Sequence, residues 1–498
     1  MKTDHARWAA LIVLCIGTLM TILDETIVNV ALPVMQEELG FTQAGVSWVI
    51  NAYLVAYGGL LIFAGRLGDL IGHRRVLLIG VSVFTVASVA AGLSANAVML
   101  VTARFGQGVG AALITAVTLA LIVTMFTDPG EQTRAIGFYS FTFAGGGALG
   151  LLVGGVLMQL TSWQWLFFIN VPIGLLSLLV GWRLLPRGGG PGLTAGLDLL
   201  GAGLLVAAVS LLVSGIINAE HHGWGGTTLV LLSGAVALLL AFVIRQRVAR
   251  VPLLHLRILR ERDVAGANIV QFLVTGGLYG SFFLATLLLQ QVLGYAPMQM
   301  ALSFVPLTIV TAIASILLAP FLTARLGERA TLLAGLVVFL AGTVLLSHVP
   351  VGGDYLADVL APLLLLGLGI GVVLPPIMAL AMSGATEDQV GVVSGLANST
   401  GMIGGAFWTA VVASLSGAVT SGLVDAGVAE REALRQGLAV GALTLAVVLG
   451  GALVVALVVL RRRLPAEPTD GGDVGAAEDG RGAGRAALRS SAPPAARS

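Results

Sequence analysis

The stretch TLMTILDETIVNVALP, residues 18–33, is apolar along most of its length but carries two adjacent carboxylates, Asp24 and Glu25. The apolar run that contains it extends over about residues 8–33, and roughly 20 residues suffice for a helix to cross a bilayer. A charge near the bilayer centre costs about 2.5–3.5 kcal/mol on insertion scales, so such charges usually have a use. The stretch therefore predicts a membrane-spanning helix that carries a functional site.

The composition of the whole chain agrees with this interpretation. Of the 498 residues, 57% are hydrophobic and 10% are charged, and the mean hydropathy is +0.99. A soluble domain carries about 25% charged residues, so this chain could not cover a water-facing surface. We expect an all-α polytopic membrane protein, because helices satisfy their own backbone hydrogen bonds in lipid.

Other classes of function find no support in the sequence. The net charge of +1 indicates no class of partner, and no basic patch with interleaved aromatic residues suggests nucleic acid. HExxH, GxSxG and Walker patterns are not seen, so neither hydrolase nor ATPase chemistry is suggested. We therefore expect no enzymatic activity, no cofactor and no metal.

Apolar runs long enough to span a bilayer occur about fourteen times. They cover approximately residues 8–33, 45–64, 76–95, 98–126, 135–160, 165–185, 198–217, 227–245, 264–293, 298–323, 330–348, 356–382, 391–420 and 437–460. Residues 464–498, rich in Pro, Gly, Ala and charge, are expected to form a disordered tail.

The distribution of arginine predicts the orientation. With the N-terminus placed in the cytoplasm, the even-numbered connections hold most of the arginines between Arg74 and Arg329, and Arg461–Arg463 follow the last run. The opposite connections hold acidic residues, with Arg431 and Arg435 as their basic residues. This asymmetry follows the positive-inside rule. It predicts cytoplasmic termini, an even number of helices and a cytoplasmic tail.

A weak internal repeat relates the two halves of the chain. GRLGDLIGHRRVLL (65–78) aligns with PFLTARLGERATLL (320–333), which pairs Gly72 with Gly327, Arg74 with Arg329 and Asp69 with Ala324. RFGQGVGAAL (104–113) aligns with LLGLGIGVVL (365–374). Two halves that share backbone signals but differ in charge indicate a transporter built from repeats.

Asp24 and Arg104 are expected at similar depths in the membrane. Asp24 lies about eight residues before the outer end of the first run, and Arg104 about six residues after the outer end of the fourth. At about 1.5 Å per residue these depths agree within a few ångströms, which permits an ion pair. The alternative is that each charge caps a helix or reaches the interface with its own side chain.

Glu25 points about 100° away from Asp24 around the helix. Its stripe is polar, with Thr18, Thr21, Glu25 and Asn29 at helical spacing, so we expect it to face a wet cavity. Further polar residues within apolar runs either line this cavity or bond between helices, and the sequence leaves both interpretations open. They are Asn51, Tyr53, Tyr57, Asn268, Gln271 and Asn398.

Several motifs together resemble the major facilitator superfamily, and within it the fourteen-helix drug:proton antiporters. The resemblance covers roughly residues 8–460 and rests on motifs in the expected order. They are LDETIVNVALP (23–33), GRLGDLIGHRR (65–75), RFGQGVGAA (104–112), GGALGLLVGG (146–155), WQWLFFINVPIG (163–174) and LDLLGAGLL (197–205).

The chain departs from that family's pattern at three places. Leu151 stands where a proline usually follows the central glycine of the fifth-helix motif, and Gln164 stands in place of an arginine. In the thirteenth helix, Gly401 and Met402 replace a common Arg-Gln pair. These departures put in question the kink of helix five and any coupling charge in the second half.

The resemblance implies a major facilitator fold with two six-helix bundles and two extra helices. The expected division is an N-terminal bundle (1–187), an extra pair (188–250), a C-terminal bundle (251–463) and the tail (464–498). The implied site residues fall into three groups. Asp24 and Arg104 couple protons, Gly65, Asp69, Gly72, Arg74 and Arg75 form a conformational switch, and Gly146, Gly150, Gly154 and Gly155 pack a helix. For the glycines, tight packing without an antiport role is equally possible, and the loop charges alternatively serve only as a topology signal.

The implied function is a monomeric, proton-coupled exporter of lipophilic, cationic drugs or dyes across the cytoplasmic membrane. Three alternatives stay open at this point. They are a dedicated exporter of one natural product, metabolite or lipid, an uncoupled facilitator, and a membrane scaffold that transports nothing.

Overall fold

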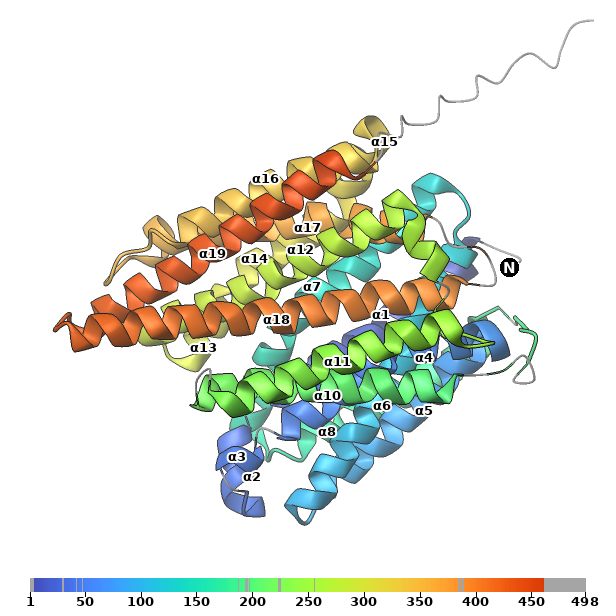
Figure 1. Cartoon of the computed structure of the whole chain (residues 1–498), viewed down its shortest axis with the longest axis horizontal. Coiled ribbons are helices and arrows are strands. Elements are labelled where there is room, and N and C mark those ends of the chain that lie inside the picture. The colour runs from blue at the N-terminus through green and yellow to red at the C-terminus, as the bar shows by residue number, and fades with distance from the viewer. Residues whose placement is uncertain are drawn as a thin grey trace, which may run out of the picture. The chain divides into compact units, whose positions relative to one another are not determined.

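The computed structural model describes residues 4–28, 31–41, 43–46, 48–186, 188–192, 196, 198–222, 225–254, 256–383, 386 and 389–460. Every regular element within these ranges is helical (Figure 1). Met1–Leu464 form one compact unit. The expected tail, residues 464–498, lies outside the described residues.

The first bundle closely follows the predicted spans. It consists of α1 (Asp4–Ile27), α4 (Trp48–Ile71), α5 (His73–Gly92), α6 (Ala97–Met125), α7 (Pro129–Leu160), and α8 (Trp165–Phe168) continued by α9 (Asn170–Leu184). Two short helices, α2 (Leu32–Leu39) and α3 (Gln43–Val46), connect α1 to α4. The prediction that the first helix reaches residue 33 was wrong. Proline lies in the first turn of α2, and because it lacks a backbone N–H it starts a new helix rather than extending the old one.

The second bundle contains more interruptions. Its elements are η3 (Leu256–Arg260), α12 (Arg262–Leu287), η4 (Leu288–Val292), α13 (Pro297–Ser303), α14 (Val305–Ile313), η5 (Ala314–Leu318), α15 (Ala319–Leu326), α16 (Glu328–Leu346), η6 (Tyr355–Val359), α17 (Leu360–Met382), α18 (Val390–Asp425) and α19 (Glu430–Val458). The segments η4, η5 and η6 are π-helical. The stretch 391–420, rich in Gly and Ser, lies within the single helix α18.

The pair α10 (Leu199–His222) and α11 (Gly226–Val248) forms a hairpin, drawn in green in Figure 1. Asp198 joins its two ends, because Oδ1 accepts from Arg245 Nε at 3.1 Å and Oδ2 from Gln246 Nε2 at 3.1 Å. The pair contacts the first bundle through α10 and α4. A Cβ at Gly59 would lie 2.8 Å from the Cα of Val206, so these two helices touch backbone to backbone.

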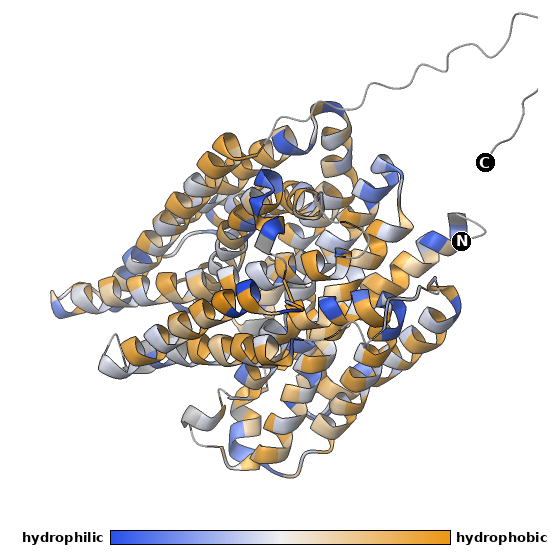
Figure 2. Ribbon diagram, turned by 45° about the vertical axis from the view of Figure 1, so that its right-hand side comes forward, coloured by the Kyte–Doolittle hydropathy of each residue, from blue (hydrophilic) through white to orange (hydrophobic). Residues whose placement is uncertain are grey.

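Twelve helices within the described ranges are long and apolar enough to cross a membrane. The fourteen spans expected from the sequence are not confirmed by this count. Hydrophobic residues run along the helices, and hydrophilic ones gather mainly near their ends (Figure 2). Large apolar side chains are also exposed, among them Leu175, Leu179, Leu240, Val447 and Val454. Such a surface suits lipid rather than water, as expected of a multi-pass membrane protein.

The two aligned loops adopt matching geometry. Gly72 and Gly327 precede α5 and α16 with φ of 97° and 81°, a region that favours glycine. Arg74 Nη2 donates to the carbonyl of Trp182 near the end of α9, and Arg329 Nη2 donates to that of Leu457 near the end of α19. The structure therefore confirms the repeat at these positions.

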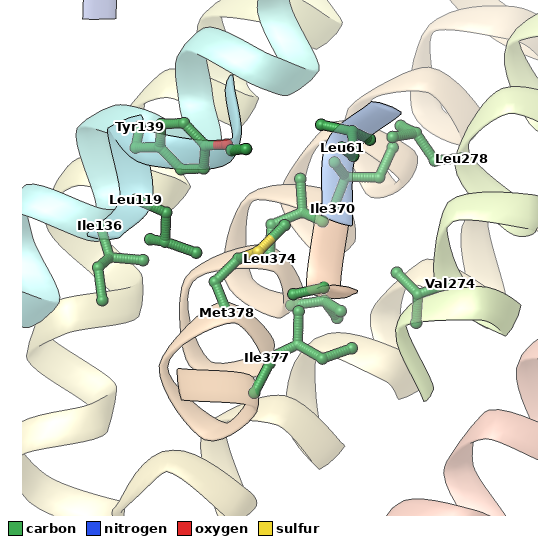
Figure 3. Close-up of a cluster of buried hydrophobic side chains, with 14 of the residues drawn as sticks. Leu61, Leu119, Ile136, Tyr139, Val274, Leu278, Ile370, Leu374, Ile377 and Met378 are labelled. Carbon is green, nitrogen blue, oxygen red and sulfur yellow. The ribbon is translucent and has the colours of Figure 1, made fainter. Parts of the chain in front are cut away.

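An apolar cluster joins the two bundles. Figure 3 shows Leu61, Leu119, Ile136 and Tyr139 of the first bundle close to Ile370, Leu374, Ile377, Met378, Val274 and Leu278 of the second. All of them belong to one buried core. The bundles are therefore held together largely by hydrophobic packing, on which the polar contacts described below are superimposed.

Candidate functional site

Asp24 and Arg104 form an ion pair with no solvent exposure. Arg104 Nη1 donates to Asp24 Oδ2, and both side chains are 0% exposed. Asp24 comes from the last turns of α1, and Arg104 from the second turn of α6. The sequence predicted that the depths of the two residues permit this pair, and the structure brings them together.

Three polar residues that the sequence analysis did not single out complete the surroundings of Asp24. Its Oδ1 accepts from Gln107 Nε2 at 2.8 Å and from Asn170 Nδ2 at 2.6 Å. Gln107 Nε2 also donates to Ser88 Oγ at 2.9 Å. Helices α6 and α9 thus meet α1 at one carboxylate, and α5 joins them through Ser88 and Gln107. Gln107 lies in the motif RFGQGVGAA (104–112) and Asn170 in WQWLFFINVPIG (163–174). A search for polar residues inside apolar runs would have found both.

The guanidinium of Arg104 is fixed from other directions as well. Its Nε donates to the carbonyl of Val49 at 2.8 Å, and its Cζ lies 4.5 Å from the ring centroid of Tyr53. The hydroxyl of Tyr53 in turn donates to the carbonyl of Thr21 at 2.9 Å. A cation over an aromatic face is attracted by the ring quadrupole. Tyr53, expected as a substrate contact, therefore supports the ion pair in this structure.

A buried pair of this kind is sensitive to loss of either partner. Removing one member leaves an uncompensated charge, which costs about 3–5 kcal/mol, whereas the complete pair adds little net stability. The arrangement is thus poorly explained by stability alone. It is suited to a step in which the charge of Asp24 changes.

The stripe around Glu25 is only partly open to solvent. Glu25 is half-buried, while Thr18 and Thr21 are 0% exposed. The Thr21 hydroxyl donates to the carbonyl of Thr18 at 2.8 Å, so it is used within its own helix. Asn29 lies outside the described residues.

The other expected substrate contacts divide between the bundles. In α4, Asn51 is buried, and the Tyr57 hydroxyl donates to Thr115 Oγ1 at 3.1 Å. In α12, Asn268 Nδ2 donates to the carbonyl of Val264 at 2.8 Å. Oδ1 of Asn268 and Oε1 of Gln271 are buried and find no partner within the described part of the chain. These two oxygens are acceptors that a ligand can use.

Asn398 connects the two bundles. Its Oδ1 accepts from the hydroxyl of Tyr139 at 3.0 Å, which joins α18 to α7. Nearby, Ser315 Oγ of η5 donates to the carbonyl of Gly137 at 2.8 Å. Asn398 therefore bonds between helices in this conformation, which is one of the two interpretations that the sequence left open.

Asp69 makes a second connection between the bundles, at the end of α4. Its Oδ1 accepts from the backbone N–H of Gly391 at 2.8 Å, and its Oδ2 from that of Val392 at 3.1 Å. Both donors lie in the first turn of α18. Helix N-termini leave such N–H groups free and favour a negative charge. His73 Nε2 approaches Oδ1 at 3.0 Å. We call this side of the bundles the Asp69 end.

Glycines allow the close approach at the Asp69 end. A Cβ at Gly65 would lie 2.6 Å from the carbonyl carbon of Gly391, and one at Gly72 would lie 2.6 Å from the carbonyl oxygen of Gly188. Of the two arginines in the expected switch, Arg74 is buried and Arg75 is exposed. The members of the expected switch thus have separate roles. Asp69 and Gly65 contact the second bundle, whereas Arg74 contacts α9.

The expected glycine motif of α7 packs against α1 over part of its length. A Cβ at Gly146 would lie 2.9 Å from Ile22 Cγ2, and one at Gly150 would lie 3.1 Å from the carbonyl oxygen of Leu23. Gly154 is buried, but Gly155 has nothing within 4 Å of its Cβ position. The motif therefore holds α7 next to the helix that carries Asp24.

No group of three or more His, Cys, Asp or Glu residues suited to a metal ion occurs among the residues that the structure describes. The buried ion pair remains the most polar feature within the bundles.

Comparison with known proteins agrees with this picture. The sequence pattern of the Major Facilitator Superfamily matches residues 14–409. The puromycin resistance protein of Streptomyces alboniger is 37% identical over 428 residues, which are 85% of this chain and 85% of that protein. The cephamycin export protein of Amycolatopsis lactamdurans is 36% identical over 425 residues, which are 84% of this chain and 87% of that protein.

A solved structure shows the same fold. The human organic anion transporter MFSD10 aligns over 89% of this chain and 99% of its own with a TM-score of 0.62, at 18% identity. Together with the extent of the sequence matches, this likeness leads to one conclusion. The chain belongs to the Major Facilitator Superfamily and is a multi-pass membrane transporter of small molecules.

Proposed function

We propose that the protein is a proton-coupled antiporter that exports lipophilic, cationic drugs or dyes across the cytoplasmic membrane by alternating access. The observation that carries the proposal is the fully buried Asp24–Arg104 pair, in which Asp24 of α1 is also bonded to Gln107 of α6 and Asn170 of α9. When Asp24 takes a proton, Arg104 loses its anion. The two charge states then favour different helix arrangements, as a coupled carrier requires.

The proposal includes the topology expected from the sequence. Fourteen spans result if α7, with 32 residues, and α10, with 24, also cross the membrane. Both are longer than the roughly 20 residues that a span needs. Both termini would then be cytoplasmic, and the Asp69 end would face the cytoplasm. The proton would be the sole coupling species without any cofactor, and one chain would suffice as the transporting unit.

A second candidate function is a dedicated exporter of one antibiotic or related natural product on the same scaffold. It is favoured by two relatives whose names refer to single compounds, puromycin and cephamycin. The buried acceptors on Asn268 and Gln271 are compatible with either a narrow or a broad range of substrates.

Transport in proteoliposomes with an imposed pH gradient tests the proposal. The panel contains two cationic dyes, one neutral dye of similar size, puromycin and a cephamycin. Gradient-driven movement of several cations supports the multidrug proposal, and movement of one antibiotic alone supports the dedicated exporter. Equal rates with and without the gradient would contradict proton coupling.

Glu25→Gln should weaken the binding of cationic substrates by about tenfold while neutral substrates of similar size change less than twofold. Glu25 is a half-buried carboxylate close to Asp24, and in such surroundings a Coulombic attraction of about 1–4 kcal/mol is available to a cation. Equilibrium binding of the two classes of dye measures the difference. An equal loss for both classes would show that Glu25 is not the partner of the cation.

Asp69→Asn should lower the rate of transport several-fold more than it lowers substrate affinity. The change removes the negative charge at the first turn of α18, and a helix cap of this kind contributes about 1 kcal/mol. Asp354→Asn is the matched control, because Asp354 Oδ1 accepts from the N–H groups of Leu356 and Ala357 without joining the bundles. If both variants alter transport alike, Asp69 has no specific conformational role.

A further inference from the structure

Among the residues that the structure describes, every partner of the Asp24 carboxylate is a hydrogen-bond donor. Oδ2 accepts from Arg104 Nη1, and Oδ1 accepts from Gln107 Nε2 and Asn170 Nδ2. An ionised carboxylate only accepts hydrogen bonds, whereas a protonated one must donate one. The surroundings seen here therefore fit the ionised form, and a proton on Asp24 requires an acceptor that is not yet in place.

Most nearby acceptors are already used. Gln107 Oε1 accepts from Arg104 Nη1 at 2.9 Å. Ser88 Oγ accepts from Gln107 Nε2 at 2.9 Å and donates to the carbonyl of Phe84 at 2.8 Å. Asn170 Oδ1, in contrast, is buried and has no partner in the described part of the chain, although its side chain already touches Asp24. It is therefore an unused acceptor on a side chain that already lies within hydrogen-bond distance of Asp24.

We propose that Asn170 is a positioning residue that responds to the protonation state of Asp24. When Asp24 is ionised, Asn170 Nδ2 donates to its Oδ1. When Oδ1 takes a proton, the amide of Asn170 turns by half a rotation about its terminal bond and its Oδ1 accepts the new O–H. The proton is transferred from a hydronium ion, which becomes water, and it leaves Asp24 again when the transport cycle restores the ionised form. No other covalent bond forms or breaks, and the inference rests on the proposed role of Asp24 as the proton carrier.

Other charged and titratable groups around Asp24 do not supply this response. Arg104 from α6 is only a donor. Glu25 is the neighbouring residue on α1 and points elsewhere around the helix. Tyr53 from α4 donates its hydroxyl to the carbonyl of Thr21. Within the described residues, α5 and α9 present Ser88 and Asn170 to this site.

The position of Asn170 allows a change in its hydrogen bond to act on neighbouring helices. Asn170 is the first residue of α9 and is separated from α8 by Ile169 alone, and α9 packs against both α1 and α5. A change in its hydrogen bond therefore acts on the junction of α8 and α9. This route is separate from the release of Arg104, which acts on α6.

Infrared difference spectroscopy between high and low pH tests the inference directly. The probe is the C=O stretching band of protonated Asp24 in reconstituted protein, identified by its loss in Asp24→Asn. A protonated carboxyl that donates a hydrogen bond absorbs at lower frequency than one that does not. Asn170→Leu, which keeps the branched shape of the side chain but removes the acceptor, should move the band to higher frequency. It should also slow proton-driven efflux by about tenfold, the equivalent of one hydrogen bond between neutral groups.

Two further variants separate this role from a structural one. Asn170→Thr supplies a hydroxyl that both donates and accepts, and should return the band towards its original frequency. Ser177→Ala removes a buried hydroxyl without a partner from the same helix, and should leave band and efflux unchanged. If Asn170→Leu does not fold, Asn170→Ala must show the same shift.

The outcomes test the proton uptake by Asp24 and the role of Asn170 separately. If no band is lost in Asp24→Asn, Asp24 does not take up a proton and the proposed function fails. If the band is present but stays in place in the Asn170 variants, the proposed function stands and the role of Asn170 is wrong.

Discussion

Asp24→Asn should abolish proton-driven efflux while substrate binding is partly retained. Asparagine keeps the shape of the side chain and some of its hydrogen bonds, but it cannot exchange a proton. It also leaves the fully buried Arg104 without its anion, which costs about 3–5 kcal/mol of stability. Efflux from proteoliposomes and thermal unfolding in detergent measure the two effects.

The double substitution is the stronger test of contact. Arg104→Ala alone leaves Asp24 buried with only neutral donors, so it should also destabilise the protein. Asp24→Asn combined with Arg104→Ala should cost clearly less than the sum of the single changes, because residues in contact couple by about 0.5–3 kcal/mol. Glu37→Gln, at an exposed acid on α2, is the control and should be neutral. Additive losses would show that the two side chains do not interact.

Gly65→Ala should open the Asp69 end of the protein and lower transport by roughly one to two orders of magnitude. The added methyl group would lie 2.6 Å from the carbonyl carbon of Gly391. Because the obstacle is backbone rather than a flexible side chain, α4 and α18 have to separate. Overpacking of this kind costs about 1–3 kcal/mol, and the cost falls only on the conformation in which the two helices touch.

Distances between spin labels at Thr127 and Thr386 measure this opening. Both residues are exposed in connections near the Asp69 end, and Cys15, the one cysteine of the chain, is replaced by alanine beforehand. Gly65→Ala should shift the distribution to longer distances. Gly451→Ala is the matched control, since nothing lies within 4 Å of its Cβ position. An unchanged distribution in Gly65→Ala would mean that this contact does not govern the conformation.

Some of the site was predictable because membrane helices restrict where charges can lie. Asp24 and Arg104 are expensive in lipid, and their depths along two antiparallel helices showed that a pair was possible, which the structure then brings together. The paired glycines, Gly72 and Gly327, were predictable because their backbone conformation has a signature in the residue type.

The remaining features depend on contacts between distant segments. Asp69 accepts from the backbone N–H groups of Gly391 and Val392. Every residue other than proline has such a group, so the sequence does not indicate which of them a distant carboxylate will bind. Arg74 similarly binds the carbonyl of Trp182. The end of α1 was misplaced because hydrophobicity continues past Ile27 into α2, where a proline lies in the first turn of a new helix.

The two bundles meet along two seams, one between α4 and α18 and one between α7 and η5 with α14. The hairpin of α10 and α11 makes the protein layer over these seams unequal in thickness. Helix α10 contacts both α4 and α18, so it shields the seam at Asp69 with an additional layer of protein. At the other seam, α7 meets η5 and α14 directly, with Ser315 bonded to Gly137. Between the lipid and the contact of α4 with α18 there is thus one more layer of protein than at the contact of α7 with η5 and α14.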